Sequence, residues 1–224
     1  MDLPNFSELS KTLMLILFFA LSCTFFGSMW IDYLYPKALQ RGSLSFPEQI
    51  QQRARLRKPT LFLALLIFFS KAWSMTAMPA LPYIIFAISL LLLMTITDFE
   101  QQVILDEMIV AFALLGPCYV FHLQLSLKDH LLASLGGGLF FLFLAFISKG
   151  AIGGGDIKLI AALGLWLGWK SLLSVILYGA IAGGIAALVL LLTKTITRKQ
   201  FLAYGPYFAL SAIGLMLKFL RTLF

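Results

Sequence analysis

Long apolar runs alternate along the chain with short segments that hold charged residues, glycine or proline. A helix that crosses the hydrocarbon core of a membrane needs about 20 mostly apolar residues. In lipid, a helix satisfies all of its backbone polar groups within one segment. The pattern therefore predicts an all-α, polytopic membrane protein with about eight transmembrane helices, at residues 12–31, 60–76, 80–97, 107–123, 130–148, 152–169, 171–193 and 203–222.

The composition favours the same class. Charged residues make up 12% of the chain and hydrophobic residues 61%, whereas soluble globular domains carry about 25% charged residues. We expect a single membrane-embedded domain over residues 1–224, with a short basic cytoplasmic loop at 32–59. The N-terminus is acidic and no small-residue cleavage site follows the first apolar run, so we predict that this run is a mature span rather than a signal peptide.

The distribution of Lys and Arg predicts the orientation of the spans. Eleven of these residues fall in segments on one side of the membrane and six on the other. The richer side is expected to be cytoplasmic, which puts both termini outside. The net charge of +7 is explained by this topology. Because no basic stripe is interleaved with exposed aromatic residues, we expect no nucleic-acid partner.

Neither cysteine nor histidine suggests a metal site. Cys23 and Cys118 lie inside apolar runs, and His122 and His130 lie on the predicted outer side. We therefore expect no metal ligands and no cofactor.

Two acidic residues at span ends are the strongest candidates for chemistry. Asp98 ends the third predicted span and Asp156 opens the sixth, so the topology puts both at the cytoplasmic face. A carboxylate at a helix C-terminus is disfavoured by the helix dipole. For Asp98, the alternative to a catalytic role is a boundary acid that reaches into water.

Asp156 follows the glycine run 153–155 and could instead cap the helix that begins there. Alternatively, the glycines allow close backbone approach and leave space for a substrate strand beside the carboxylate. Lys158 lies on a different helix face and is interpreted as a lysine that extends its amine to the membrane surface rather than as an ion-pair partner of Asp156.

The remaining acids have simpler interpretations. Asp106 and Glu107 open the fourth predicted span, where capping and the helix dipole both favour acids. Asp32 and Glu48 lie in the predicted basic loop and are expected to be solvated.

Two carboxylates at one membrane face can hydrolyse a peptide bond. Carboxylates brought close together cannot both ionise, so the two share a proton. The ionised carboxylate then deprotonates water while the protonated one polarises the scissile carbonyl. The titration belongs to the pair rather than to either residue.

Three segments carry a resemblance to a known family. One runs from Asp98 to Asp106, another from Gly153 to Gly164, and the third from Tyr204 to Leu210. In this order they resemble the prepilin peptidases, which are type IV leader peptidases of the Gly-x-Gly-Asp intramembrane aspartyl protease class. The resemblance covers nearly the whole chain.

The resemblance implies a function and a set of site residues. It implies cleavage of the basic leader peptide from prepilins or pseudopilins, after a glycine at the start of an apolar helix, in the bacterial inner membrane at its cytoplasmic face. Membrane lipid is the other expected partner, and no oligomeric state is predicted. Asp98 and Asp156 would be the catalytic pair, and substrate binding or motif support would come from Gly153, Gly155, Lys158, Asp106, Gly205 and Pro206.

The chain departs from the family pattern in two places. Leu105 stands where the family usually has proline. Bifunctional members also methylate the new N-terminus and carry four zinc-binding cysteines in the first cytoplasmic loop, whereas residues 32–59 contain no cysteine. We therefore expect a short form with little or no N-methylation activity.

Alternatives of the same and of other classes stay open. A preflagellin or presenilin-like peptidase would use the same chemistry, but the Gly205-Pro206 segment favours a prepilin peptidase. A non-catalytic membrane scaffold of pilus assembly or a small transporter is the alternative of another class. A transporter would be expected to carry polar residues at the membrane midplane.

Overall fold

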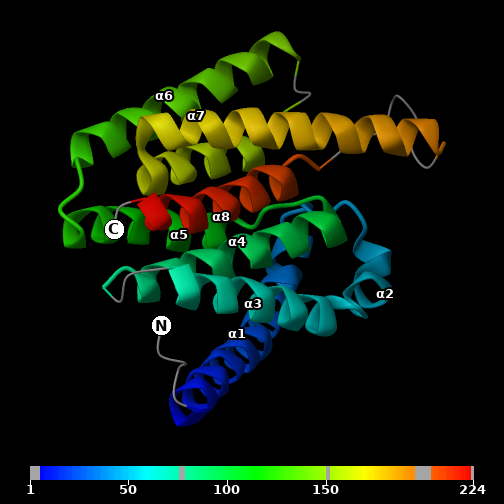
Figure 1. Cartoon of the computed structure of the whole chain (residues 1–224). Coiled ribbons are helices and arrows are strands. Elements are labelled where there is room, and N and C mark those ends of the chain that lie inside the picture. The colour runs from blue at the N-terminus through cyan, green and yellow to red at the C-terminus, as the bar shows by residue number, and fades with distance from the viewer. Residues whose placement is uncertain (1–5, 76–78, 150–151, 195–202, 223–224) are drawn as a thin grey trace.

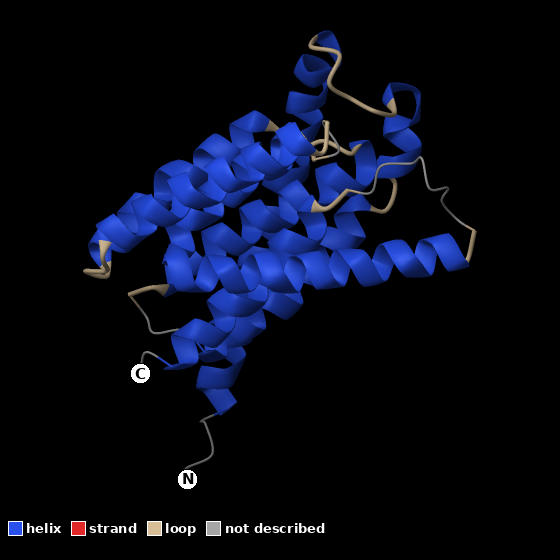
Figure 2. Cartoon of the chain, turned by 90° about the horizontal axis from the view of Figure 1, so that it is seen from above, coloured by secondary structure: helices blue, strands red, loops and turns tan. Residues whose placement is uncertain are grey.

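The computed structural model describes residues 6–75, 79–149, 152–194 and 203–222. These residues form helices and connecting turns, without a strand in the part of the chain described, so the all-α prediction is confirmed (Figure 2). In chain order the helices are α1 (Phe6–Gln40), the 3₁₀ turn η1 (Pro47–Gln49), α2 (Ile50–Ala54), α3 (Arg57–Met75), α4 (Leu81–Gln101), α5 (Asp106–His122), α6 (Leu127–Ile147), α7 (Gly154–Leu192) and α8 (Gly205–Thr222).

Each predicted span coincides with one helix, except that the sixth and seventh are the two halves of α7. Within the described residues, four helices are long and apolar enough to cross a membrane: α1 from Ser10, α4, α6 and α7. The count of eight crossings and their orientation therefore stay predictions. Residues 1–5 at the N-terminus and the basic residues Arg198 and Lys199 lie outside the described residues.

The predicted basic loop at 32–59 is shorter than expected. Helix α1 continues to Gln40 with Pro36 inside it, and α3 begins at Arg57. The connection between them, residues 41–56, contains η1 and the short helix α2. Asp32 lies on α1 rather than in that loop and forms an ion pair with Arg57, while its side chain is 60% exposed, as expected for a solvated residue. Glu48 is exposed, as expected.

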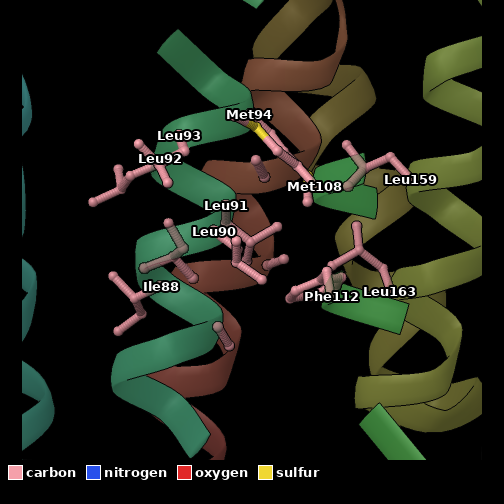
Figure 3. Close-up of a cluster of buried hydrophobic side chains, with 14 of the residues drawn as sticks. Ile88, Leu90, Leu91, Leu92, Leu93, Met94, Met108, Phe112, Leu159 and Leu163 are labelled. Carbon is pink, nitrogen blue, oxygen red and sulfur yellow. The ribbon is translucent and has the colours of Figure 1, made fainter. Parts of the chain in front are cut away.

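Helix α4 forms the centre of the fold. It packs against α1, α3, α5 and α8, and most of its length is buried inside the protein (Figure 1). Figure 3 shows Met94 of α4 beside Met108 of α5, with Leu159 of α7 close by. Because Asp98 is carried by this central helix, its position depends on the packing of the whole core.

A sharp turn divides α7 at Gly168, whose backbone is left-handed (φ 70°, ψ 177°). A side chain at this position would clash with Oδ2 of Asp129 on α6. The same carboxylate accepts a hydrogen bond of 3.1 Å from the backbone N–H of Trp169, the first residue after the turn. Asp129 therefore caps the second half of α7 from a neighbouring helix.

Small residues let α6 and α7 approach closely. A Cβ built on Gly164 of α7 would lie 2.5 Å from the backbone N of Ser134 on α6. In membranes, helix association depends on such close packing because lipid supplies no hydrophobic driving force between helices. This packing fixes the first half of α7, and with it Asp156, against the rest of the fold.

Candidate active site

A cavity of about 750 Å³ lies where the end of α4 meets the beginnings of α7 and α8. Its polar lining includes Ser45, Asp98, Gln102, Asp156 and the backbone of residues 153–155. Its apolar lining is formed by side chains of the α4–α5 connection, of α6, α7 and α8, and of the segment just before α8, among them Ile104, Phe141, Ala180, Tyr204 and Phe208. The cavity wall therefore offers both polar groups and apolar side chains to a bound peptide.

Asp98 lies in the last turn of α4, just before Gln102 ends the helix in a left-handed conformation (φ 51°). The residue is only 5% exposed. Among the described residues, its Oδ2 atom is buried without a hydrogen-bond partner. A buried polar atom without a partner is costly and is often found at functional sites. The boundary acid reaching into water, which was the alternative for Asp98, does not fit this burial.

Asp156 lies in the first turn of α7 and is partly buried. The helix begins at Gly154, its N-cap is Gly153, and no side-chain hydrogen bond is made by that cap. The alternative that Asp156 caps the helix is therefore wrong. The positive end of the helix dipole nevertheless favours a carboxylate there.

Gly205 brings the two carboxylates together. A Cβ built on this glycine would lie 2.6 Å from Oδ2 of Asp98 and 3.2 Å from Oδ1 of Asp156. The backbone amide of Gly205 faces both carboxyl groups. A single small group at this position would thus contact both aspartates. Pro206 follows in the first turn of α8, where a missing backbone N–H is tolerated.

The glycines before Asp156 leave the cavity wall open. Gly153 and Gly154 are exposed and line the cavity. Gly155 packs closely, because a Cβ there would lie 3.2 Å from Cβ of Ile104. This arrangement leaves backbone polar groups accessible beside Asp156.

Lys158 and Asp106 lie close to the aspartates in sequence but do not line the cavity. The Nζ atom of Lys158 donates to Oδ1 of Asp106 at 2.7 Å, in an ion pair that is about half exposed. As expected, Lys158 is exposed and does not pair with Asp156, but its ion pair with Asp106 was not predicted. Asp106 is not a capping residue either, because the N-cap of α5 is Leu105. The neighbouring acid Glu107 pairs with Arg41 at 3.0 Å.

Sequence interpretation missed several residues around the site. Ser45 and Phe141 line the cavity from segments that no motif singled out. Glu100, two residues after Asp98, is buried and ion-paired to Arg57. An acidic residue beside an apolar span end was the available signal for Glu100, and no signal was available for the other two.

Part of the chain is similar in sequence to a known protein family. Residues 84–188 match the model of the type IV leader peptidase family. This segment contains both Asp98 and Asp156, so the predicted resemblance is confirmed over it. No solved structure matches the chain.

Three similar proteins are each named prepilin leader peptidase/N-methyltransferase. The protein from Pectobacterium carotovorum subsp. carotovorum is 35% identical over 135 residues, which cover 56% of this chain and 47% of that relative. The protein from Aeromonas hydrophila is 27% identical, over 67% of this chain and 52% of its own length. The protein from Bacillus subtilis is 31% identical, over 59% and 53%. This chain thus spans about half the length of these curated relatives.

Proposed function

We propose that this chain, with its type IV leader peptidase segment at residues 84–188, is an aspartic endopeptidase that removes the basic leader peptide from type IV prepilins or pseudopilins. Asp98 and Asp156 are its catalytic residues. The main support for this proposal is that the carboxylates of Asp98 and Asp156 both lie against Gly205, beside one cavity. We propose further that residues 1–224 act as one membrane-embedded peptidase domain in the bacterial inner membrane, with the site at the cytoplasmic face.

The site supports hydrolysis by the two aspartates, here called the aspartate dyad. One carboxylate is ionised and takes a proton from water, while the other is protonated and donates to the scissile carbonyl oxygen. Attack by the water forms a tetrahedral intermediate, and the leaving amine takes a proton as the C–N bond breaks. This chemistry requires neither a metal nor an organic cofactor.

The cavity also fits the proposed substrate. A prepilin presents a polar leader followed by an apolar helix. The apolar wall around Phe141, Ala180 and Phe208 suits the start of such a helix. The exposed backbone of Gly153 and Gly154 suits an extended leader. The scissile bond would lie between these two parts, next to the dyad.

N-methylation of the product is not part of the proposal, although the similar proteins carry that activity in their names. A structural zinc site needs four ligands, usually mostly Cys or His. The α1–α3 connection, residues 41–56, contains neither residue type. The donor set therefore does not fit a zinc site there.

Cleavage can be tested in cells that lack other prepilin peptidases. Co-expression with the prepilin encoded nearest its gene should shorten that prepilin on a gel, and mass spectrometry should find a new N-terminus after the leader without a methyl group. A prepilin that keeps its leader would contradict the peptidase, and a fully methylated product would contradict the short-form assignment. In a variant lacking Cys23 and Cys118, a single cysteine at position 149 should react with thiol reagents only from the cytoplasm.

A further inference from the structure

The last turn of α4 depends on a segment outside the peptidase match for its hydrogen bonds. The final four carbonyl groups of a helix have no partner within the helix. In α4, the carbonyl of Asp98 accepts from the N–H of Gln102 at 2.8 Å. The carbonyls of Phe99 and Glu100 accept from Arg53 at 3.5 and 3.2 Å. The carbonyl of Gln101 accepts from the N–H of Ser45 at 3.2 Å. Three of the four terminal carbonyls are thus satisfied by the α1–α3 connection.

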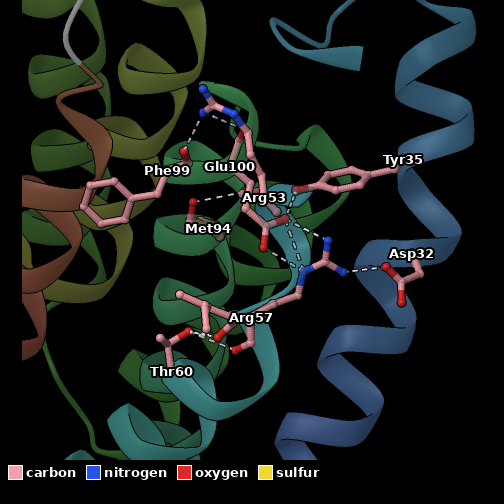
Figure 4. A network of polar contacts seen from close by, with 10 residues as sticks. Asp32, Tyr35, Arg53, Arg57, Thr60, Met94, Phe99 and Glu100 are labelled. Atoms are coloured by element: carbon pink, nitrogen blue, oxygen red, sulfur yellow. Dashed lines mark hydrogen bonds and ion pairs between the residues drawn. The ribbon is translucent and has the colours of Figure 1, made fainter. Parts of the chain in front are cut away.

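The same turn is fixed a second time through a buried side chain. Glu100 accepts from Nε and Nη2 of Arg57 at 2.8 and 2.7 Å, and from the hydroxyl of Tyr35 at 2.7 Å. Arg57 also pairs with Asp32 on α1. Figure 4 shows these side chains converging from α1, α3 and α4. The side chains of Arg57 and Glu100 are 1% and 7% exposed, so both charges are desolvated and rely on this geometry.

We propose that Arg53, Arg57 and Glu100 act as positioning residues, a clamp that holds the last turn of α4 so that Asp98 faces Asp156 in the geometry that cleavage needs. This inference rests on the proposed peptidase function and goes beyond it, because Arg53 and Arg57 lie outside the segment 84–188. None of the three lines the cavity. Their effect on the reaction therefore passes through the backbone of α4.

A structural role alone does not explain a charged clamp at this place. A buried ion pair usually gives no more stability than well-packed apolar side chains of similar size. Unlike apolar packing, the directional hydrogen bonds of the ion pair allow only one arrangement of the helix end. Asp98 lies two residues from Glu100, and catalysis is sensitive to displacements of about 1 Å. The clamp thus controls the position of a reacting group rather than the amount of folded protein.

The first test compares two neighbouring arginines in the full-length protein. Arg53→Ala removes the donor to two carbonyls of α4, while Arg55→Ala changes an exposed residue of the same charge. We expect Arg53→Ala to lower kcat for prepilin cleavage severalfold with KM unchanged, and Arg55→Ala to leave both near the wild-type values. Amide hydrogen exchange of residues 98–102 should become faster only in Arg53→Ala.

The second test removes both buried charges together. The double variant Arg57→Met/Glu100→Met keeps an apolar filling, so the protein should remain folded and membrane-inserted. We expect kcat to fall on the order of tenfold or more, with KM changed less than twofold. Exchange of residues 98–102 should again become faster, while exchange within α5 should not change.

The outcomes separate this inference from the proposed function. Unchanged kcat and unchanged exchange in Arg53→Ala would overturn the clamp, whether or not the double variant folds. Activity that falls only in proportion to the amount of folded protein would also overturn it, because that result indicates a purely structural role. If the wild-type protein cleaves no prepilin, the proposed function fails, while the exchange measurements still decide whether the clamp holds α4.

Discussion

At each of two ends of this molecule, the carboxylate of an aspartate lies against a glycine. The two carboxylates differ in their exposure and in their hydrogen bonds. At the turn of α7, Asp129 lies against Gly168 and accepts a hydrogen bond from the N–H of Trp169. At the cavity, Asp98 lies against Gly205, and a Cβ there would be 2.6 Å from its Oδ2 atom. Asp129 is exposed, whereas Asp98 is 5% exposed and its Oδ2 atom has no hydrogen-bond partner among the described residues.

The difference indicates which aspartate can take part in chemistry. The carboxylate of Asp129 accepts a hydrogen bond from a backbone N–H at the start of a helix, so the fold itself accounts for this aspartate. Asp98 is held beside Asp156 with one oxygen unsatisfied, at a cost that packing elsewhere must offset. A carboxylate in that state can bind water or a substrate carbonyl. The same pair of residue types thus satisfies a helix end at Gly168 and, at Gly205, leaves a carboxylate oxygen without a partner among the described residues.

The largest effect should come from the aspartate dyad. Asp98→Asn and Asp156→Asn keep the side-chain shape but remove the acid and base functions. Each should lower prepilin cleavage by several orders of magnitude, because neither residue alone supplies both proton transfers. Cleavage per amount of membrane-inserted protein is the measurement. Asp129→Asn is the matched control and should retain activity, since asparagine also caps helices.

Gly205→Ala should give the next largest effect. Its methyl group would lie 2.6 Å from Oδ2 of Asp98 and 2.8 Å from Cδ1 of Ile104, closer than van der Waals contact allows. The carboxylates must shift, so kcat/KM should fall on the order of a hundredfold. Gly214→Ala on the same helix has open space and should change little. Equal activity of the two alanine variants would show that Gly205 does not set the geometry of the site.

Asp129→Ala should affect stability rather than catalysis. Removing a side-chain cap costs about 1 kcal/mol, so the unfolding temperature in detergent should fall while kcat per folded enzyme stays near the wild-type value. Asp129→Asn should restore the stability. A loss of kcat in Asp129→Ala that Asp129→Asn does not repair would contradict a purely structural role at this end.

The smallest effect is expected for the ion pair beside the cavity. Lys158→Met breaks a contact with Asp106 that is about half exposed. Exposed ion pairs contribute about 0.5 kcal/mol, so cleavage should fall no more than a few fold. Asp106→Asn should behave alike, and the double variant should be no worse than either single one. A loss comparable with that of Asp156→Asn would instead give Lys158 a direct role in the reaction.

The helices and the two aspartates could be predicted from the sequence because both depend on local signals. Apolar runs of membrane-spanning length predicted the all-α fold, and the motifs around Asp98 and Asp156 selected those two acids. The predicted break between the sixth and seventh spans, at residue 170, lies two residues after the turn at Gly168. The partner of that turn, Asp129, could not be predicted because it lies on another helix.

Ion pairs between residues far apart in the sequence could not be predicted. The sequence pattern predicts residues 32–59 as one basic loop and Lys158 as a lysine at the membrane surface, and it gives neither Arg57 nor Lys158 an ion-pair partner. In the structure, Arg57 is buried against Glu100, and Lys158 pairs with Asp106. Each pair joins residues more than forty positions apart. Sequence spacing reports which residues share a helix face, but not which faces of different helices meet.

The most direct test of the account is whether positions 98 and 156 face one another in the membrane. In a variant lacking Cys23 and Cys118, cysteines replace Asp98 and Asp156, and a protease site is inserted in the α5–α6 connection at residues 123–126. After treatment with a short thiol-to-thiol cross-linker and protease, we predict that the two halves stay joined on a denaturing gel. A matched variant with cysteines at positions 98 and 170, at opposite ends of the fold, should separate. Separation of the 98–156 variant under conditions where each cysteine reacts singly would contradict the aspartate dyad.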